Sequence, residues 1–304
     1  MSQPSFNDLC RQLCRELQAP LPPLSPTAEG HSTFSMVIDG IPVTIAHAPS
    51  HAPDRLLILA ELGAVPHGRE HEAHLSALDA NLRLQGAHPL SIGRSPDSDM
   101  LVLQMARPIA SLDAIAVLGD LMAIAGAARE WRAEGCPADL TALAESLASL
   151  QPEAAEAGMA HEFRSLCSAL CEAAALPVPE AGDLPDGTQA MEINLRGVRM
   201  ILSHGPHTGP GHLQVLATFG ALPADRTPEA ARRLLELNAQ VLGLGFAFAR
   251  HPWNGDILLR QAMPLPGTTG VELLQRLGEI AEGIEGWQSH HFLPSNTPAR
   301  TAMH

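Results

Sequence analysis

The sequence lacks two residue types altogether and is poor in aromatic side chains. All 19 basic residues are arginine, tyrosine is absent, and aromatic residues make up 3% of the chain. Without lysine, the chain has no P-loop lysine, no pyridoxal phosphate Schiff base and no lysine nucleophile. No run approaches the about 20 continuous apolar residues that a membrane-spanning helix needs, and the polar start is unlike a signal peptide. We therefore expect no membrane as a partner.

Positive charge is also scarce. The 304 residues carry 33 acidic and 19 basic side chains, which gives a formal net charge of −14. Binding to nucleic acid or to an anionic membrane requires clustered cations, so neither is an expected partner. The hydrophobic content of 45% predicts a globular protein. The length suits two domains of about 100–150 residues, each with its own core.

Cysteine is limited to five residues, and their spacing matches no zinc ribbon or thioredoxin motif. Four of them form two C-x3-C pairs inside predicted helices, Cys10 with Cys14 and Cys167 with Cys171. An odd number of cysteines without a signal peptide indicates reduced thiols in a cytoplasm. We expect these side chains to be small apolar residues on buried helix faces.

What the sequence does contain is a long internal repeat. The segment Leu213–Pro223 (LQVLATFGALP) matches Leu56–Pro66 (LLILAELGAVP) at a distance of 157 positions. At the same offset a pattern F-x-x-L-C-x-x-L-C recurs, and Asn81 falls on Asn238. A repeat of this length predicts two similar units in tandem.

Hydrophobic periodicity predicts the same order of elements, α-β-β-β-α-β-β-α, in both units. Asp39-Gly40 between two alternating apolar runs predicts a hairpin, because both turn residues need a positive φ. The third helix is expected to bury a side that includes Ile115, Leu121 and Met122. In the first unit we expect helices over 6–17, 68–85 and 112–131 and strands over 36–38, 41–45, 56–62, 89–94 and 100–106.

The repeat also divides the chain. We assign the first unit to residues 1–134 and the second to residues 160–288. Between them, residues 135–159 are rich in alanine and glutamate and contain leucines at helical spacing, which predicts a partly helical linker. Residues 289–304 contain proline and serine and are expected to form a flexible tail.

Among the possible chemical sites, a metal site formed by three histidines is the strongest candidate. The spacing of these histidines nevertheless does not favour metal binding. His67, His71 and His74 lie on one helical face, and histidines four residues apart can share a cation. However, the H-E-x-x-H motif is one residue short, and the second unit has no histidine at the matching positions. The sequence also has no G-x-S-x-G, Ser-x-x-Lys or CxxC motif. We therefore expect no catalytic residue, no metal site, no cofactor and no enzyme activity, with a histidine-dependent metalloenzyme as a remote alternative.

The middle helix of each unit has apolar residues on more than one side. A helix that covers a single sheet needs one apolar stripe, so a wider apolar surface indicates a second contact. One explanation is that each middle helix is buried within its own unit; the other is that the two middle helices pack against each other. The predicted inter-unit interface consists of Leu75, Leu78, Leu82, Leu234, Leu235, Ala239 and Leu242.

Several segments resemble the CesT-type (Tir chaperone) family of type III secretion chaperones. The resemblance is carried by Leu213–Pro223, the helix Ala231–Asn238 and the strand Gly255–Arg260, with Leu56–Pro66 and the helix that ends at Asn81 in the first unit. It covers both units. It implies an α+β fold in which a twisted antiparallel sheet is packed by helices, and in which units dimerise through the second helix.

The resemblance also implies a function. Members of the family are cytoplasmic proteins of Gram-negative bacteria that bind the extended N-terminal segment of a secreted effector and keep it soluble. The secretion ATPase of the export apparatus is a second candidate partner. A non-secretory protein-binding or scaffold protein of the same fold is the alternative. The effector-binding residues implied by the family are apolar residues of the first helix and of the outer sheet faces, namely Leu13, Leu17, Leu21, Leu57, Leu59, Leu170, Val178 and Leu216.

The chain departs from the family pattern because it fuses two units that are usually separate. A linker of this length gives the units an effective concentration of about 1 mM for each other, if it spans the two sites. Pairing within one chain should therefore compete successfully with pairing between chains. We expect an intramolecular pseudo-dimer that is a monomer in solution, with two binding surfaces that are not equivalent.

Overall fold

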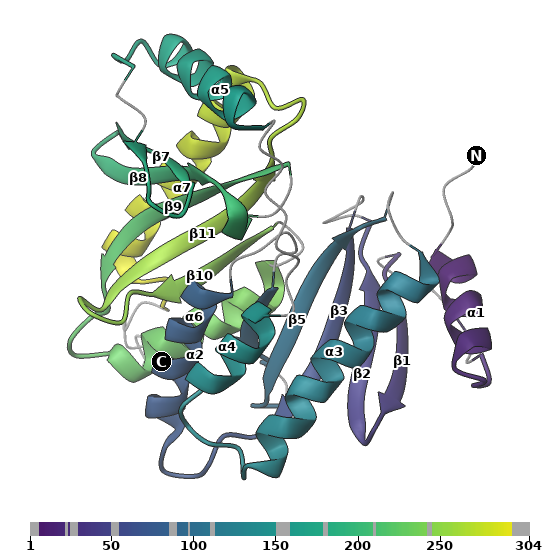
Figure 1. Cartoon of the computed structure of the whole chain (residues 1–304). Helices are drawn as coiled ribbons and strands as arrows, with labels where there is room; N and C mark the ends of the chain where they lie inside the picture. The colour runs from purple at the N-terminus through teal and green to yellow at the C-terminus, as the bar shows by residue number, and fades with distance from the viewer. Residues whose placement is uncertain are drawn as a thin grey trace, which may run out of the picture.

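The computed structural model contains two helix-covered antiparallel sheets that lie side by side (Figure 1). It describes residues 6–21, 24, 30–49, 55–84, 90–96, 98–109, 113–149, 159–178, 182–208, 211–241 and 245–293. Within these residues no helix is both long enough and apolar enough to cross a membrane. The predicted α+β fold with two repeated units is confirmed.

The first unit has the predicted order of elements, and its strands form one antiparallel sheet in the order β1-β2-β3-β5-β4. The predicted hairpin is confirmed, because Asp39 and Gly40 both have a positive φ, 50° and 81°. The elements are α1 (Phe6–Glu16), β1 (Ser32–Ile38), β2 (Ile41–His47), β3 (Arg55–Gly63), α2 (Glu70–Arg83), β4 (Leu90–Arg94), β5 (Leu101–Pro108) and α3 (Ala114–Ala133).

The second unit repeats this order and adds one short strand. Its sheet has the order β10-β11-β9-β8-β7-β6, in which β6 is an addition that the repeat did not predict. The elements are α5 (Met159–Ala173), β6 (Gly182–Asp183), β7 (Gln189–Leu195), β8 (Val198–His204), η2 (Pro206–Thr208), β9 (His212–Ala221), α6 (Thr227–Val241), β10 (Phe246–Arg250), β11 (Asp256–Pro264) and α7 (Gly270–His290).

Outside the two predicted units, the structure describes one further helix and the end of another. A further helix, α4 (Thr141–Ser149), lies in the predicted linker. Helix α7 continues through His290, beyond the predicted end of the second unit, and Leu293 after it is buried. The remainder of the predicted tail, residues 294–304, lies outside the described residues.

Each unit buries one face of its sheet under its long last helix. Helix α3 packs on β3 and β2, and alternate strand residues such as Ile45 and Ile58 are fully buried beneath it. Helices α1 and α5 turn their cysteines inward, and burial raises the pKa of the Cys10 and Cys167 thiols to about 12. These thiols are therefore neutral at neutral pH and pack as small apolar side chains, as predicted.

The two units join through their middle helices. Helix α2 packs on α6, and each of them also packs on the edge strand of the other unit, α2 on β10 and α6 on β4. Each edge strand is therefore covered mainly by the helix of the opposite unit. This crossed arrangement is the predicted intramolecular pseudo-dimer.

Two buried asparagines hold the centre of this interface. In α2, the Asn81 side chain accepts from the N–H of Ile92 in β4 at 2.6 Å and donates to its carbonyl at 2.9 Å. In α6, Asn238 binds Phe248 of β10 in the same way, at 2.7 and 2.9 Å. Each amide nitrogen also reaches the carbonyl of the other unit, at 3.3 Å from Asn81 to Phe248 and 3.4 Å from Asn238 to Ile92. An asparagine amide has the donor and acceptor of a peptide group, so it satisfies a strand edge as a neighbouring strand would.

We expect Asn81→Ala to lower the free energy of unfolding by about 3 kcal/mol, because the buried N–H and carbonyl of Ile92 lose their partners. Asn238→Ala should cost a similar amount through Phe248. Urea denaturation measures both values. The control is Asn7→Ala, which changes an exposed asparagine of α1. A loss below about 0.5 kcal/mol for both interface variants would contradict this role of the asparagines.

Pairing within the chain also predicts the state in solution. Because each middle helix already covers the edge strand of the other unit, the interface is complete in one chain, and light scattering should give a mass close to 32.2 kDa. A stable particle of twice that mass across a dilution series would show that pairing between chains is preferred.

Candidate functional site

The residues predicted to bind an effector differ widely in exposure. Leu13 and Leu170 are fully buried in the cores of their units, so they do not line an open surface. Each helix has a single apolar stripe, and this stripe faces the long last helix of its unit, α3 for α1 and α7 for α5. The remaining six are accessible: Leu21 and Val178 are exposed, and Leu17, Leu57, Leu59 and Leu216 are half-buried.

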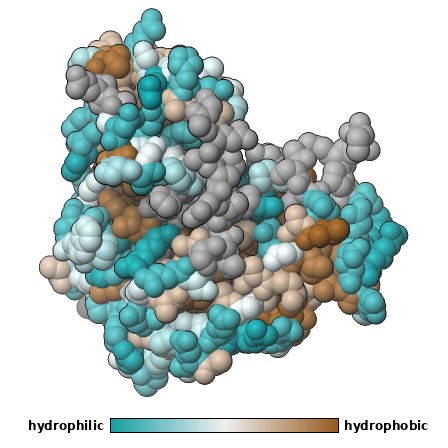
Figure 2. Space-filling view, in the orientation of Figure 1, coloured by the Kyte–Doolittle hydropathy of each residue, from teal (hydrophilic) through white to brown (hydrophobic). Residues whose placement is uncertain are grey.

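Three of the accessible residues lie on the outer faces of the sheets, away from the long helices. Leu57 and Leu59 alternate along β3 with the buried Leu56 and Ile58. In the second unit, Leu216 is on the outer face of β9. Figure 2 shows hydrophobic surface over the second sheet, which lies in front of α7 in this orientation. The outer faces thus carry apolar side chains that no helix fully covers.

A free strand edge lies beside the outer face of the first sheet. Among the described residues, β1 pairs only with β2, so the backbone groups on its other side face away from the sheet. Val37 in β1 is 68% exposed, on the same face of the sheet as Leu57 and Leu59. In the second unit, the corresponding strand β7 is paired at one end with β6, and Gln189 donates to Asp183 at 3.0 Å. The first unit therefore has the more open edge.

Exposed apolar residues on α3 correct one prediction. Ile115 and Met122 were assigned to the buried side of this helix, but they are 67% and 46% exposed. Leu121 is buried as predicted, but its buried neighbours are Val117 and Ile124, because nearly the whole helix is apolar and periodicity alone does not select one side. Figure 2 shows hydrophobic surface in the region of α3.

The predicted interface residues divide between buried and half-buried positions. Leu78, Leu234 and Leu235 are fully buried, and Leu75, Leu82 and Ala239 are half-buried. The backbone of Ala239 approaches Gly93 of β4 so closely that a Cβ on Gly93 would lie 2.8 Å from the Ala239 nitrogen. Leu242 lies outside the described residues.

Two ion pairs between the units lie near the buried asparagines. Sequence periodicity did not predict these ion pairs. In β4, Arg94 pairs with Glu236 of α6 at 2.6 Å. At the matching positions, Arg250 of β10 donates two hydrogen bonds of 2.6 Å to Asp79 of α2. Both ion pairs connect one unit with the other. An offset of 157 residues aligns Asp79 with Glu236, but Arg94 and Arg250 are 156 residues apart, so the repeat at a single offset reveals the acidic partners and not the arginines.

The interface is not symmetric at one central position. Gln104 of β5 donates to the carbonyl of Asn238 at 2.6 Å. By strand pairing, the equivalent residue in the second unit is Arg260 of β11, because Gln104 lies opposite Ser91 of β4 and Arg260 lies opposite Ala247 of β10. Its guanidinium donates to the carbonyls of Leu84 and Leu90 in the first unit. Burial lowers the pKa of Arg260 to about 10, so it is still charged at neutral pH. Two copies of either unit would place two like residues here, whereas the fused chain places one of each.

The three histidines do not come together as a metal site. His67 is fully exposed and pairs with Glu70 at 3.1 Å, while His74 is buried at the interface. No group of three histidine, cysteine or acidic side chains in the described part of the chain is placed to hold a metal ion. What the arrangement offers instead is apolar surface and an open strand edge.

Comparison with known proteins adds a family. Residues 8–132 match the Tir chaperone protein (CesT) family. No curated protein matches the chain.

Solved structures give weaker likenesses. A chain of the ExsC–ExsE complex matches 45% of this chain and 97% of its own length, with 16% identity and a TM-score of 0.35. A chain of the ExoT–SpcS complex from Pseudomonas aeruginosa matches 42% and 98%, with 21% identity and a TM-score of 0.31. A chain from the complex of the Yersinia pestis type III secretion chaperone SycH with a fragment of YscM2 matches 41% and 98%, with 17% identity and a TM-score of 0.31. At these TM-scores the structural similarities are too weak to indicate a function.

The buried histidine predicts a pH dependence. Burial, together with the nearby Arg94 and Arg232, lowers the pKa of His74 to about 4, against about 6.5 in the unfolded chain. Between pH 6.5 and pH 4, His74 is protonated in the unfolded chain but not in the folded one. The free energy of unfolding should therefore fall by about 2 kcal/mol between pH 7 and pH 5.

His74→Ala should remove this part of the pH dependence. Alanine fits because the matching position in α6 is Ala231, which is also buried. Urea denaturation at pH 7 and pH 5 measures the difference for both proteins. If the chain and the variant lose equal stability, His74 is not the group that titrates.

Proposed function

We propose that the chain, whose residues 8–132 match the Tir chaperone protein (CesT) family, is a type III secretion chaperone. It binds the N-terminal segment of a secreted effector in the bacterial cytoplasm and keeps that segment extended and soluble. The second unit repeats the fold of the first and completes the dimer-like body within one chain. The proposal includes no catalytic step and no cofactor.

The observation that carries the proposal is the open edge of β1 beside apolar residues of the outer sheet face. An extended peptide can add a strand to such an edge, because the free N–H and carbonyl groups of β1 bind its backbone. Alternate side chains of the added strand then lie beside Val37 on the outer face, and the segment beyond that strand can cross the same face to Leu57 and Leu59, two strands further into the sheet. Backbone pairing accepts many sequences, and the apolar residues favour peptides with hydrophobic side chains at alternate positions.

The apolar contacts supply the affinity that backbone hydrogen bonds alone do not. Hydrogen bonds to the bound peptide replace hydrogen bonds to water, so their net contribution is about 1 kcal/mol each. Burying apolar surface contributes about 25 cal/mol for each Å² removed from water. Leu57 and Leu59 are half-buried in the free chain and still have surface to lose.

The two units would not bind their segment in the same way. In the second unit, β6 pairs with part of the β7 edge, and the outer face has Ile201 in place of Thr44 and Gln214 in place of Leu57, while Leu216 matches Leu59. We therefore propose that the effector segment adds a strand to the first unit and contacts the second through its outer face. The secretion ATPase remains a proposed partner for delivery of the complex.

Co-expression with a secreted protein encoded beside this chain tests the function. We expect the two proteins to co-purify, and the complex to be lost when about 100 N-terminal residues of the secreted protein are removed, because the proposed contact is to an extended N-terminal segment. A scaffold protein without a secretion role would instead bind a folded partner and keep it after this deletion.

Two substitutions test the surface. Val37→Glu and Leu59→Glu should each reduce effector capture by about 10-fold or more, because a carboxylate replaces apolar contact area. The control is Val271→Glu, which changes an equally exposed valine on α7. Circular dichroism confirms that each variant is folded. Equal capture by all three variants would place the effector elsewhere.

A further inference from the structure

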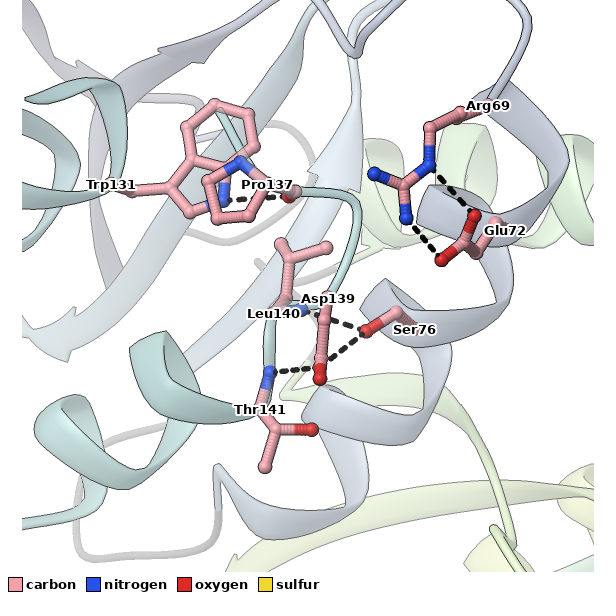
Figure 3. A network of polar contacts seen from close by, with 8 residues as sticks. All are labelled: Arg69, Glu72, Ser76, Trp131, Pro137, Asp139, Leu140 and Thr141. Carbon is pink, nitrogen blue, oxygen red and sulfur yellow. Dashed lines mark hydrogen bonds and ion pairs between the residues drawn. The ribbon is translucent and has the colours of Figure 1, made fainter. Parts of the chain in front are cut away.

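The outer side of α2 is covered by the linker helix. Ser76 of α2 accepts a hydrogen bond of 2.8 Å from the backbone N–H of Leu140, at the start of α4. Asp139 caps α4 by accepting from the N–H of Thr141 at 2.9 Å, and Arg83 of α2 pairs with Glu145 at 2.7 Å. Figure 3 shows this side of α2, with Ser76 pointing to Asp139 and Leu140. Helix α4, with the carboxylates of Asp139 and Glu145, therefore covers this side of the first unit.

The matching side of α6 has no such cover among the described residues. It borders a cavity of about 470 Å³ that is lined by Arg226, Glu229, Arg232, Arg233, Glu236, Phe292 and Leu293. At an offset of 157 residues, Arg226 and Glu229 match the pair Arg69–Glu72 beside α4. The cavity therefore lies on the side of α6 that corresponds to the α4-binding side of α2.

Two substitutions between the units make this side of α6 basic. Leu75 and Ser76 of α2 are replaced by Arg232 and Arg233. Both arginines approach Glu236, but only at 3.6 and 3.5 Å, and the same carboxylate already pairs with Arg94 at 2.6 Å. Arg94 also pairs with Asp99, and Arg226 pairs with Glu229. The cavity is therefore lined by three arginines and two glutamates, an excess of positive charge in a chain whose net charge is −14.

We propose that this side of α6 is a docking site for an acidic helical segment of a partner protein. The segment would lie on α6 as α4 lies on α2, with its carboxylates paired to Arg232 and Arg233. A guanidinium binds a carboxylate through two parallel hydrogen bonds, so arginine suits this contact. The half-buried Phe292 and the buried Leu293 form the apolar wall of the cavity.

Charge makes the C-terminal residues of this chain a poorer occupant. Residues 294–304 follow Leu293 directly, but they contain no aspartate or glutamate and include Arg300 and two prolines. They therefore offer neither side-chain carboxylates nor a good helix. The site does not depend on the strand edge of β1, so the proposal stands or fails separately from the proposed function.

A synthetic peptide tests the site on the full chain. The probe is a fluorescein-labelled peptide with the sequence of residues 138–149, in which positions 142 and 146, exposed in α4, are changed to glutamate. The control probe has glutamine or asparagine in place of every acid. By fluorescence anisotropy, we expect the acidic peptide to bind at least about 10-fold more tightly than the neutral one, and its binding to weaken as salt rises.

The matched variant is the double substitution Arg232→Leu and Arg233→Ser, which copies the residues of α2 and should therefore fold. It should weaken binding of the acidic peptide by about 10-fold or more, whereas Arg276→Glu on α7, which reverses an exposed arginine, should leave it unchanged. Equal binding of both peptides, equal binding by the double variant, or no binding at about 1 mM peptide overturns the proposal.

Deleting residues 294–304 tests whether the C-terminal residues of the same chain occupy the cavity. The shortened chain should bind the acidic peptide with unchanged affinity. If the peptide binds only after the deletion, the C-terminal residues occupy the cavity themselves, and the proposal of a partner segment is wrong.

Discussion

The structure depends on how two strand edges are satisfied where the units meet. Strands β4 and β10 are the last strands of their sheets, and both run through the buried centre of the molecule. An unpaired backbone group in such a place costs about 1–3 kcal/mol. Asn81 and Asn238 remove this cost by supplying peptide-like amides from helices. Each amide also contacts the edge strand of the other unit. The same two side chains therefore satisfy the edges of the sheets and join the units.

Fusion of the units permits differences that a homodimer does not allow. In a two-fold symmetric dimer, every residue at the interface occurs twice. Here Gln104 occupies one central position and the buried Arg260 the other, each bound to backbone carbonyls of the opposite unit. A symmetric pair of buried arginines would bring two like charges into one apolar region, at considerable cost.

The same freedom separates the surfaces of the two units. Helix α4 closes one side of the first unit, and the corresponding side of the second unit carries arginines around a cavity. Conversely, β6 pairs with part of the edge strand of the second unit, whereas in the described part of the chain the edge of the first unit is open. The two halves share one fold but present different chemistry to a partner. Duplication supplies the framework, and local insertions or substitutions decide what each half contacts.

The sequence alone determined the repeat, the order of elements, the Asp39-Gly40 hairpin and the likeness to the chaperone family, because these depend on local patterns. It did not determine which apolar residues stay accessible. Leu13 and Ile115 both fit a helical stripe, yet the first is buried and the second is exposed. Only the tertiary structure decided that Asn81 reaches Phe248 and that Arg94 reaches Glu236, since periodicity gives the face of an element but not the neighbour that the chain brings to it.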